Sequence, residues 1–444
     1  MAVINVDAQS CKPYDVVILG ASCFTGKYVV REALKFLNAP NSPLKSLALA
    51  GRSPSRLSEA LKWAGGPKHA QKIPLLCADT SDPDSLARLA SQARIVLNCV
   101  GPFRLHGQPV VAACVESGCD YLDICGETEF MERMEASYHD EAAENGSLVV
   151  SACGFDTVPA EMGMLFHSSH WIGPSAPSRV EAYLSLESEK RIGANYGTYE
   201  SAVLGLANAH KLAELRRSSP RRPRPKGFVI EQQKELGLWA LRLPSADSSV
   251  IRRTQAAFTE NPRGLAGEKE SIEHAKMRES FWSSVKPAHF SLKIGSKSLL
   301  GLLPVITLSV FLGPLSRSRV GRWLLLKFPS LFSLGLFSKK WPSEEEVASA
   351  TFKMWFVGQG YSDSSVALNP DTQVVTRLMG PEIGYLTTPI VLLQCALVLL
   401  DDRDNLPKGG VYTPGTVFGP TDLMQRLREN GISFDFISWK PLSS

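Results

Sequence analysis

A glycine-containing turn near the N-terminus, GASCFTG at positions 20–26, has the residue types and spacing to hold a phosphate group. It follows the apolar run DVVIL and opens a helical pattern, so free backbone N–H groups at a helix N-terminus would face an anion. Such a turn binds the pyrophosphate of a dinucleotide, and a nicotinamide dinucleotide would supply hydride transfer. The predicted cofactor contacts in the turn are Gly20, Ser22, Cys23, Phe24, Thr25 and Gly26.

Cys23 occupies the position where a second glycine is expected, so its side chain intrudes where a phosphate oxygen comes close. If Cys23 needed a positive φ, the strain would cost about 1–2 kcal/mol. The anion site would survive, because it depends on N–H groups and the positive end of the helix. A strand–turn–helix unit without a ligand is the alternative.

The end of the next apolar run, in ALAGRSPSRL, indicates which dinucleotide is bound. Arg52 and Ser53 lie where the adenosine ribose is expected, and no acidic residue is present to bind a 2′-hydroxyl. Arginine favours bidentate contact with a 2′-phosphate, so the predicted cofactor is NADP(H). Ser53 followed by Pro54 also suits a helix start. Asp79 would contact the adenine or, as the favoured alternative, cap the helix beginning at 82.

Three later segments, NCVGPF (98–103), DICGE (123–127) and SACGFDTVP (151–159), end predicted strands where the nicotinamide would lie. Reduction requires a proton source within reach of the substrate. Glu127 and Asp156 are the nearest carboxyls, although capping a helix or binding loop amides is the stronger alternative for each. Further candidates for the acid are Tyr199, Tyr196 and His106. The remaining predicted cofactor contacts are Val100, Gly101 and Pro102.

The first 153 residues alternate apolar runs with helical patterns, which predicts an α/β fold, a Rossmann-type doubly wound parallel sheet. A second α+β domain follows. We expect a dinucleotide-binding domain at 1–153, a substrate or dimerisation domain at 154–405, and a C-terminal segment at 406–444 that packs back on the first domain. Expected strands lie at 15–20, 46–50, 73–78, 94–99, 120–125, 147–152, 179–188 and 372–380, and expected helices at 25–36, 54–63, 82–92, 107–117, 127–145, 196–215, 388–400 and 421–431.

Residues 298–337, named the arm from here on, are the most apolar part of the chain. Prolines and a lysine interrupt them, so two short helices are expected rather than a membrane-spanning one. Between Ser280 and Ser343 there are nine basic residues and no acidic residue. This combination favours contact with a membrane or lipid-droplet surface. The alternative is an arm packed into a homodimer interface or over the substrate cleft.

Composition excludes several other classes of protein. The basic residues outside 280–343 are outnumbered by acidic ones, and no nucleic-acid-binding motif is present, so we expect no nucleic-acid partner. The nine cysteines are odd in number and lie mostly in apolar runs, which indicates free thiols in a reducing, intracellular compartment. Cys114, Cys119 and Cys125 lack the paired short spacings of a zinc site, so no metal is expected. The loop 216–227, with three prolines and six basic residues, is expected to be exposed.

These segments, together with GTYESA, FVGQGYSDS, MGPEIGYLTTP and GGVYTPGTVFGPTDL, resemble the saccharopine dehydrogenase-like oxidoreductases from about residue 14 to 440. The resemblance implies a nucleotide-binding first half and a mixed second domain, with membrane or lipid-droplet association in animal members. A mycobacterial branch that resembles the chain more distantly acts as an enoyl reductase on lipid intermediates. The family's turn usually reads GASGFTG, from which Cys23 departs.

The sequence therefore predicts an NADP(H)-dependent oxidoreductase that reduces a C=C, C=N or C=O bond of an apolar, lipid- or isoprenoid-like small molecule at a membrane surface. We expect an intracellular protein at a peripheral membrane or lipid-droplet surface, or associated with mitochondria. One alternative is a non-catalytic membrane-associated protein with a degenerate Rossmann site. A second is a saccharopine or other amino acid dehydrogenase, which would need a cluster of Arg or Lys at the cleft.

Overall fold

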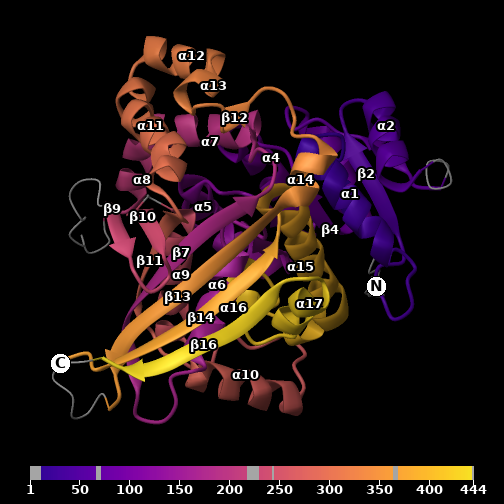
Figure 1. The fold of residues 1–444 in the computed structure, drawn as a ribbon. Helices are drawn as coiled ribbons and strands as arrows, with labels where there is room; N and C mark the ends of the chain where they lie inside the picture. Colours follow the sequence, from indigo (N-terminus) through magenta and orange to yellow (C-terminus); the bar gives the residue numbers. More distant parts are fainter. Residues whose placement is uncertain (1–11, 67–71, 218–229, 243–244, 364–368, 443–444) are drawn as a thin grey trace.

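The first domain is a seven-stranded parallel sheet (Figure 1). The structure, a computed structural model, describes residues 12–66, 72–217, 230–242, 245–363 and 369–442. The strand order β15-β6-β5-β4-β1-β2-β3 is the doubly wound order with one strand added at its edge, which confirms the predicted α/β class. The strands are β1 Tyr14–Leu19, β2 Leu47–Gly51, β3 Leu75–Cys77, β4 Ala93–Asn98, β5 Asp120–Asp123, β6 Leu148–Val150 and β15 Gly410–Tyr412.

Both faces of this sheet are buried, as the near-continuous apolar runs of a parallel sheet require. In β1, Val16 and Ile18 belong to one core cluster, whereas Val17 and Leu19 belong to another on the opposite face. Helices cover the faces close to the predicted positions, except that α4 begins at Phe103 rather than 107. They are α1 Phe24–Phe36, α2 Pro54–Gly65, α3 Pro83–Gln92, α4 Phe103–Glu116 and α5 Thr128–Asn145.

The second domain is a mixed seven-stranded sheet with the order β16-β14-β13-β7-β11-β10-β9. Only the pairing of β11 with β7 is parallel among the described strands of this sheet. The strands are β7 Ala176–Ser188, β9 Ile230–Gln233, β10 Leu238–Arg242, β11 His289–Ser296, β13 Ala350–Tyr361, β14 Thr372–Pro381 and β16 Ser433–Pro441. A small separate sheet pairs β8 (Ala194–Asn195) with β12 (Phe337–Ser338).

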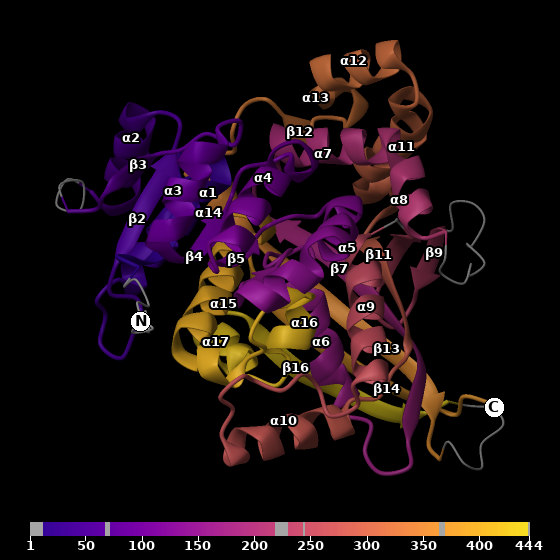
Figure 2. The same ribbon diagram turned by 180° about the vertical axis from the view of Figure 1, so that it is seen from behind.

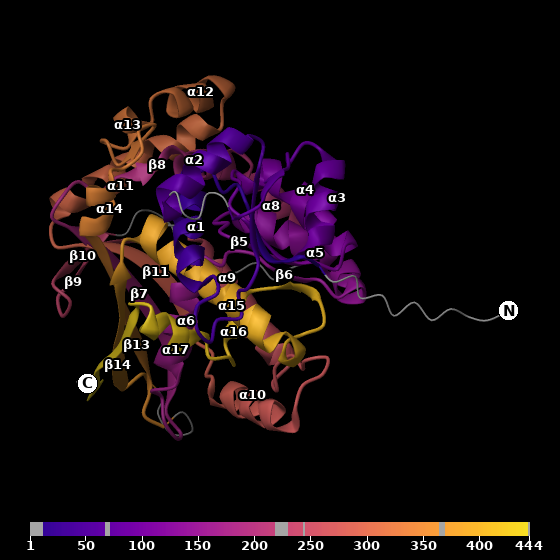
Figure 3. The same ribbon diagram turned by 90° about the vertical axis from the view of Figure 1, so that its right-hand side faces the viewer.

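Helix α15 (Thr388–Asp402) runs between the two sheets (Figure 3). Its residues from Ile390 to Leu400 are buried, and they share one core cluster with β1, β4, β7 and β13. A π-helical turn, η1 (Ile383–Thr387), leads into it. Because this single cluster contains side chains of both sheets, the two domains fold around a common core.

The remaining helices surround this core, with α9 and α6 visible beside the second sheet from behind (Figure 2). The predicted helix at 196–215 is broken at Asn208 into α7 and α8. Cys11 and most of the expected loop 216–227 lie outside the described residues. The helices are α6 Val158–Ser168, α7 Tyr196–Ala207, α8 Ala209–Leu215, α9 Ala246–Glu260, α10 Ile272–Ser284, α14 Glu344–Ser349, η2 Arg403–Asn405, α16 Pro414–Phe418 and α17 Leu423–Glu429.

The C-terminal segment is divided between the two sheets. β15 pairs with β6 at the edge of the first sheet, while β16 pairs with β14 at the edge of the second. The residues expected to pack back on the first domain therefore also complete the second one.

The arm forms three helices, α11 (Leu299–Ser316), α12 (Arg319–Lys327) and α13 (Pro329–Phe332), at the edge of the molecule (Figure 1). The expectation that prolines would shorten the first helix is wrong, because α11 continues through Pro304 and Pro314. Two described helical stretches are long and apolar enough to cross a membrane: α11, of which 17% is buried, and residues 383–405, of which 83% is buried. The second is the core helix described above, so only α11 presents its apolar side chains outward.

Shortening a side chain of α15 should destabilise both domains together. Leu393→Ala leaves a cavity in the shared core, where Leu393 is 0% exposed, and should lower the free energy of unfolding by about 2–5 kcal/mol in a single urea transition. Leu300→Ala on the arm, where the side chain is 75% exposed, should change it by less than about 0.5 kcal/mol. Two separate transitions in the Leu393→Ala protein would contradict the common core.

Candidate active site

The glycine turn between β1 and α1 has the close backbone approaches that a dinucleotide-binding turn needs. Gly20 has φ +80°, and a Cβ atom on it would lie 2.7 Å from Cγ2 of Val100. A Cβ on Gly26 would lie 2.2 Å from the carbonyl oxygen of Gly20. Because neither position tolerates a side chain, the turn keeps the N-terminus of α1 open toward the carboxyl edge of the sheet, and the residues present fit a dinucleotide.

Cys23 is the N-cap of α1 and not a strained residue. Its φ of −75° and ψ of 167° are extended, so the positive φ considered from the sequence does not occur. The thiol sulfur accepts a hydrogen bond from the Gly26 amide at 3.2 Å and donates to the carbonyl oxygen of Cys99 at 3.3 Å. Burial raises the pKa of the thiol. The side chain therefore points inward against the core and caps the helix in its neutral form.

Phe24 cannot offer its ring to a cofactor. It is 2% exposed and packs against Tyr385 and Trp341, with ring centroids 4.6 and 4.9 Å apart. Ser22 and Thr25 are half-buried within the turn. The predicted contacts through Ser22, Thr25 and the backbone of the turn remain available, whereas a contact through the Phe24 side chain is corrected.

Arg52 lies at the end of β2 with an exposed side chain, and it makes no ion pair within the described residues. Ser53 is the N-cap of α2, because its hydroxyl accepts a hydrogen bond from the Arg56 amide at 3.4 Å. Asp79 does not cap α3, since Asp82 does so by accepting from the Ser85 amide. The Asp79 carboxylate binds the amide and hydroxyl of Ser81 instead, and these contacts lower its pKa.

A buried polar chain fixes the ends of β4, β5 and β6. The Asn98 side-chain amide donates to the Tyr121 hydroxyl at 3.1 Å, and this hydroxyl donates to Asp123 at 2.9 Å. The other Asp123 oxygen accepts from the amides of Cys125 and Ala152, yet burial still raises the pKa of Asp123 to about 6. Asn98 also accepts from the Val100 amide at 2.9 Å, so this chain positions the loop that contains Val100, exposed Gly101 and buried Pro102.

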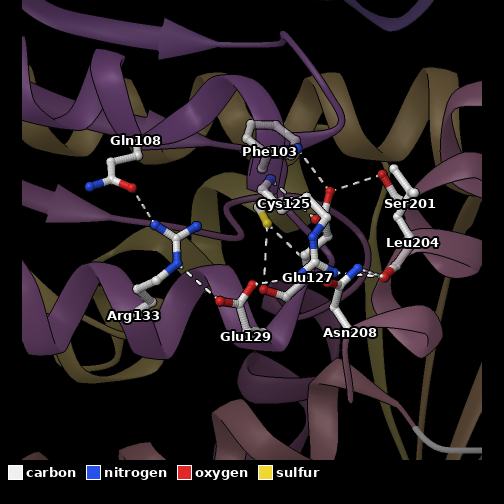
Figure 4. Close-up of polar contacts among 10 residues, drawn as sticks. Phe103, Gln108, Cys125, Glu127, Glu129, Arg133, Ser201, Leu204 and Asn208 are labelled. Carbon is white, nitrogen blue, oxygen red and sulfur yellow. Dashed lines mark hydrogen bonds and ion pairs between the residues drawn. The ribbon is translucent and has the colours of Figure 1, made fainter. Parts of the chain in front are cut away.

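Glu127 joins three elements (Figure 4). Its carboxylate accepts hydrogen bonds from the Phe103 amide at 2.8 Å, the Arg104 amide at 3.2 Å and the Ser201 hydroxyl at 2.9 Å. It thus caps α4 rather than α5, the helix that it precedes, which explains the early start of α4. Since three donors hold its oxygens, these contacts favour a positioning role for Glu127, whereas its role as a proton donor stays a prediction.

An arginine network extends from the same place. Arg104 donates to the Leu204 carbonyl oxygen and to Glu129, both at 2.8 Å, and Arg133 donates to Glu129 at 3.0 Å. The Arg104–Glu129 pair is almost fully buried. These contacts fasten α7 of the second domain to α4 and α5 of the first.

A cavity of about 250 Å³ lies between the carboxyl edge of the first sheet and the face of the second. The first domain contributes Asp156 and the loop glycine Gly126. The second contributes Asp247 from the first turn of α9. The other lining residues are Phe155, Leu184, Ser245, Ala246, Leu292, Ile294 and Met354.

Asp156 and Asp247 are the two carboxyls of this cavity. The Asp156 side chain is exposed, and partial desolvation by the surrounding protein raises its pKa. Asp247 is 6% exposed, and burial, followed in size by the repulsion of Asp156, raises its pKa to about 8. Sequence reasoning found Asp156 at a strand end but missed Asp247, because LPSADSSV carries no motif and only the tertiary fold brings it to the first domain.

The other acid candidates lie elsewhere. Tyr199 is 0% exposed and packs in an apolar cluster with the arm, where burial raises its pKa to about 12, so its prediction as a catalytic residue is corrected. Tyr196 lies beneath the Lys339 ammonium, 5.3 Å from ring centroid to nitrogen. His106 contacts the Thr80 hydroxyl at 3.2 Å. None of these three lines the cavity.

The cysteines and potential metal ligands can be located for the part of the chain that the structure describes. The eight described cysteines are all free, and Cys114, Cys119 and Cys125 are buried. No group of three or more potential metal ligands is found among the described residues.

Residues 16–150 match the family model described as the saccharopine dehydrogenase NADP binding domain. A relative from Arabidopsis thaliana, provisionally named a mitochondrial saccharopine dehydrogenase-like oxidoreductase, is 64% identical, and the alignment covers 96% of each chain. A lipid droplet localized protein of Caenorhabditis elegans is 34% identical over 96% of this chain and 98% of its own. A Mycobacterium tuberculosis protein, provisionally named a trans-acting enoyl reductase, is 29% identical over 95% and 97%.

The fold is similar to the solved structure of apo saccharopine dehydrogenase (L-Glu forming) from Saccharomyces cerevisiae. The TM-score is 0.52 with 10% sequence identity, and the match covers 96% of this chain and 99% of that one. At this identity the similarity concerns the arrangement of the two domains.

Replacing Arg52 should affect the binding of NADPH and the binding of NADH differently. Arg52→Ala should weaken NADPH binding roughly 10- to 100-fold through the lost contact with the 2′-phosphate, and should change NADH binding little. Nicotinamide fluorescence titration measures both. Arg94→Ala, at the opposite edge of the sheet where Arg94 pairs with Asp15, serves as the control. An equal loss for NADPH and NADH would contradict the role of Arg52.

Replacing Asp247 should stabilise the protein in a pH-dependent way. The raised pKa means that the folded protein holds a proton on Asp247 while the unfolded chain releases it above about pH 4, so stability falls as the pH rises toward about 8. Asp247→Asn removes this penalty and should be more stable than the wild type by at least about 1 kcal/mol at pH 8, with little difference at pH 4. Urea unfolding at the two pH values tests this, and an equal effect at both would contradict it.

Proposed function

Because the chain belongs to the saccharopine dehydrogenase-like oxidoreductase family and its cofactor is NADP(H), we propose that it reduces a C=C, C=N or C=O bond of an apolar small molecule at a membrane surface. The observation that carries this proposal is the cavity between the sheets. It adjoins the strand ends where the nicotinamide would lie, and its lining is mostly apolar. Bound NADPH supplies a hydride, and the chain's residues must position the substrate, exclude water and provide a proton.

The composition of the cavity supports an apolar substrate. Its second-sheet wall consists of Leu184, Leu292, Ile294 and Met354, and no Lys, Arg or His lines it among the described residues. A substrate with several carboxylates would need such cations, so the structure disfavours the amino acid dehydrogenase alternative. The volume is slightly below the roughly 300 Å³ at which common ligand sites begin, which suits the reacting end of a longer molecule.

The arm supports the location at a lipid surface. Ten of the 21 exposed large apolar side chains of the described residues lie in its 40 residues, a concentration that marks an interaction site in soluble proteins. Val320, Leu300 and Leu331 are 69, 75 and 68% exposed. On its inner side, Leu302 and Leu325 pack tightly, and Leu325 lies in one cluster with Tyr199 of α7, so the outer side chains are presented by a firmly seated element.

The basic residues around the arm divide into two groups. Lys286, Lys293 and Lys297 are engaged in the second domain: Lys293 pairs with Glu181 at 3.0 Å, Lys297 with Glu187 at 3.0 Å, and Lys286 donates to backbone carbonyls. The other six make no ion pair within the described residues: Arg317, Arg319, Arg322, Lys327, Lys339 and Lys340. Arg322 donates to the Ser316 carbonyl oxygen at 2.9 Å, and the other five are exposed and available to anionic headgroups. Of the nine cations expected near a membrane, we propose that these exposed ones contact it.

The names of two relatives support this location. The worm relative is named for lipid droplets, whose surface is a phospholipid monolayer, and the plant relative for mitochondria, whose membranes offer similar headgroups. The mycobacterial relative's enoyl reductase name agrees with the reduction of a C=C bond. A non-catalytic scaffold is the alternative, and it predicts no binding of NADPH at millimolar concentration.

Charge placed on the arm should abolish lipid binding. The double variant Val320→Glu with Leu331→Glu should float with liposomes that contain anionic phospholipid in a fraction at least tenfold smaller than the wild type. Two carboxylates would otherwise have to enter the acyl boundary. The matched control is Ile272→Glu on α10, where a 78% exposed apolar side chain lies far from the arm (Figure 1). Unchanged flotation would contradict the proposal, and a concentration-dependent dimer lost only in the arm variant would assign the arm to a homodimer interface.

A further inference from the structure

The cavity brings together two carboxyls that the chain keeps 91 positions apart, Asp156 after β6 and Asp247 in the first turn of α9. Asp156 belongs to the first domain's carboxyl edge and Asp247 to the second domain. Elsewhere at this edge, the carboxylates of Asp123 and Glu127 are occupied by backbone amides. Asp156 and Asp247 are the carboxyls left facing the space where a substrate can enter.

Neither carboxyl has an ion-pair partner among the described residues. The Ser245 hydroxyl donates to Asp247, and Asp247 makes no ion pair within the described residues. An Asp156 oxygen lies against Gly126, where an added Cβ atom would come within 2.6 Å of it. The charged groups that act most on Asp247 are two other carboxyls, Asp156 and Glu161, and the Glu161 side chain is bound by Thr254 and the Gly415 amide. No cation of the described residues lines the cavity.

We propose that Asp247, paired with Asp156 across the cavity, is the proton donor of the reduction. The inference rests on the proposed function. The substrate's electrophilic carbon takes the hydride of NADPH, the C=O or conjugated C=C π bond breaks, and the atom that receives its electron pair takes the proton of the Asp247 carboxylic acid, directly or by way of an enol. The products are NADP⁺, the reduced substrate and the Asp247 carboxylate, which regains a proton from water.

The pair also indicates the substrate class. Two neighbouring carboxyls in a mostly apolar cavity ionise in sequence, because the second charge is repelled by the first, so one of them keeps its proton near neutral pH. The high pKa of Asp247 agrees with this order. A carboxylic acid hydrogen-bonds a neutral carbonyl oxygen, whereas a preformed iminium ion would need no donor. The cavity therefore fits a ketone, an aldehyde or an α,β-unsaturated carbonyl on an apolar carbon skeleton.

The first experiment follows the proton itself and needs no substrate. Infrared difference spectra of wild type against Asp247→Asn at pH 7 should show a carboxylic acid C=O band in the wild type that the variant lacks. In Asp156→Asn, the midpoint at which this band disappears should move to lower pH, because a neighbouring negative charge has been removed. A wild-type spectrum without the band at pH 7, or a midpoint that does not move, would overturn the inference.

The second experiment measures turnover with NADPH and three probes, trans-2-decenal, 2-decanone and decanal, by the loss of absorbance at 340 nm. Asp247→Asn should lower kcat about 100-fold or more and leave the Kd for NADPH within twofold of the wild type. Gly126→Ala, which displaces the Asp156 carboxyl, should shift the alkaline limb of the kcat profile. The matched control, Glu260→Gln at the exposed far end of α9, should match the wild type.

The two experiments distinguish a failure of the proposed carbonyl reduction from a failure of the proposed role of Asp247. A wild-type protein that binds NADPH and shows the acid band but reduces none of the three probes contradicts the proposed carbonyl reduction while the protonated pair stands. A wild type that reduces a probe, with Asp247→Asn equally active, overturns the role of Asp247 while the reductase stands.

Discussion

The packing of the second sheet against the carboxyl edge of the first, around the shared helix α15, is the constraint on which the rest of the structure depends. A parallel sheet ends in loops that carry backbone groups and polar side chains, and here the loops after β5 and β6 face the apolar wall of the second sheet. Each polar group at that edge must therefore find a partner or bear the cost of desolvation. Which groups have a hydrogen-bond or ion-pair partner therefore decides which polar groups of the candidate site are structural.

Most of the buried carboxylates at this edge do find partners. Asp123 accepts from two amides and a tyrosine, and Glu127 from two amides and a serine, so both maintain the loops in place. Glu129 forms a buried ion pair with Arg104. Asp156 and Asp247 make no ion pair within the described residues and share a cavity, and desolvation raises the pKa of each. The division between structural and chemically available acids is thus made by hydrogen bonding and not by residue type.

In the arm it is apolar side chains, and not polar ones, that lack partners within the described chain. Its inner side chains join the cluster around Tyr199, while its outer apolar side chains have no cover from the rest of the described chain. Helix α7 connects this cluster to the Glu127 and Arg104 contacts through Ser201 and Leu204. Helix α7 therefore contacts both the apolar cluster of the arm and the loops at the carboxyl edge of the first sheet.

The sequence by itself determined six of the seven strands of the first sheet, because near-continuous apolar strands and glycine turns are local signals. The seventh, β15, comes from the far end of the chain and only the tertiary structure places it there. The sequence also predicted the glycine turn between β1 and α1, within residues that match an NADP binding domain. Only the tertiary structure decided that Cys23 caps a helix with an ordinary φ, that Glu127 caps a helix preceding its own, and that Tyr199 belongs to the apolar cluster. Asp247 had no local signal at all. Its position beside Asp156 arises from contacts between segments distant in the chain, and a pKa depends on burial and neighbours that no short sequence window contains.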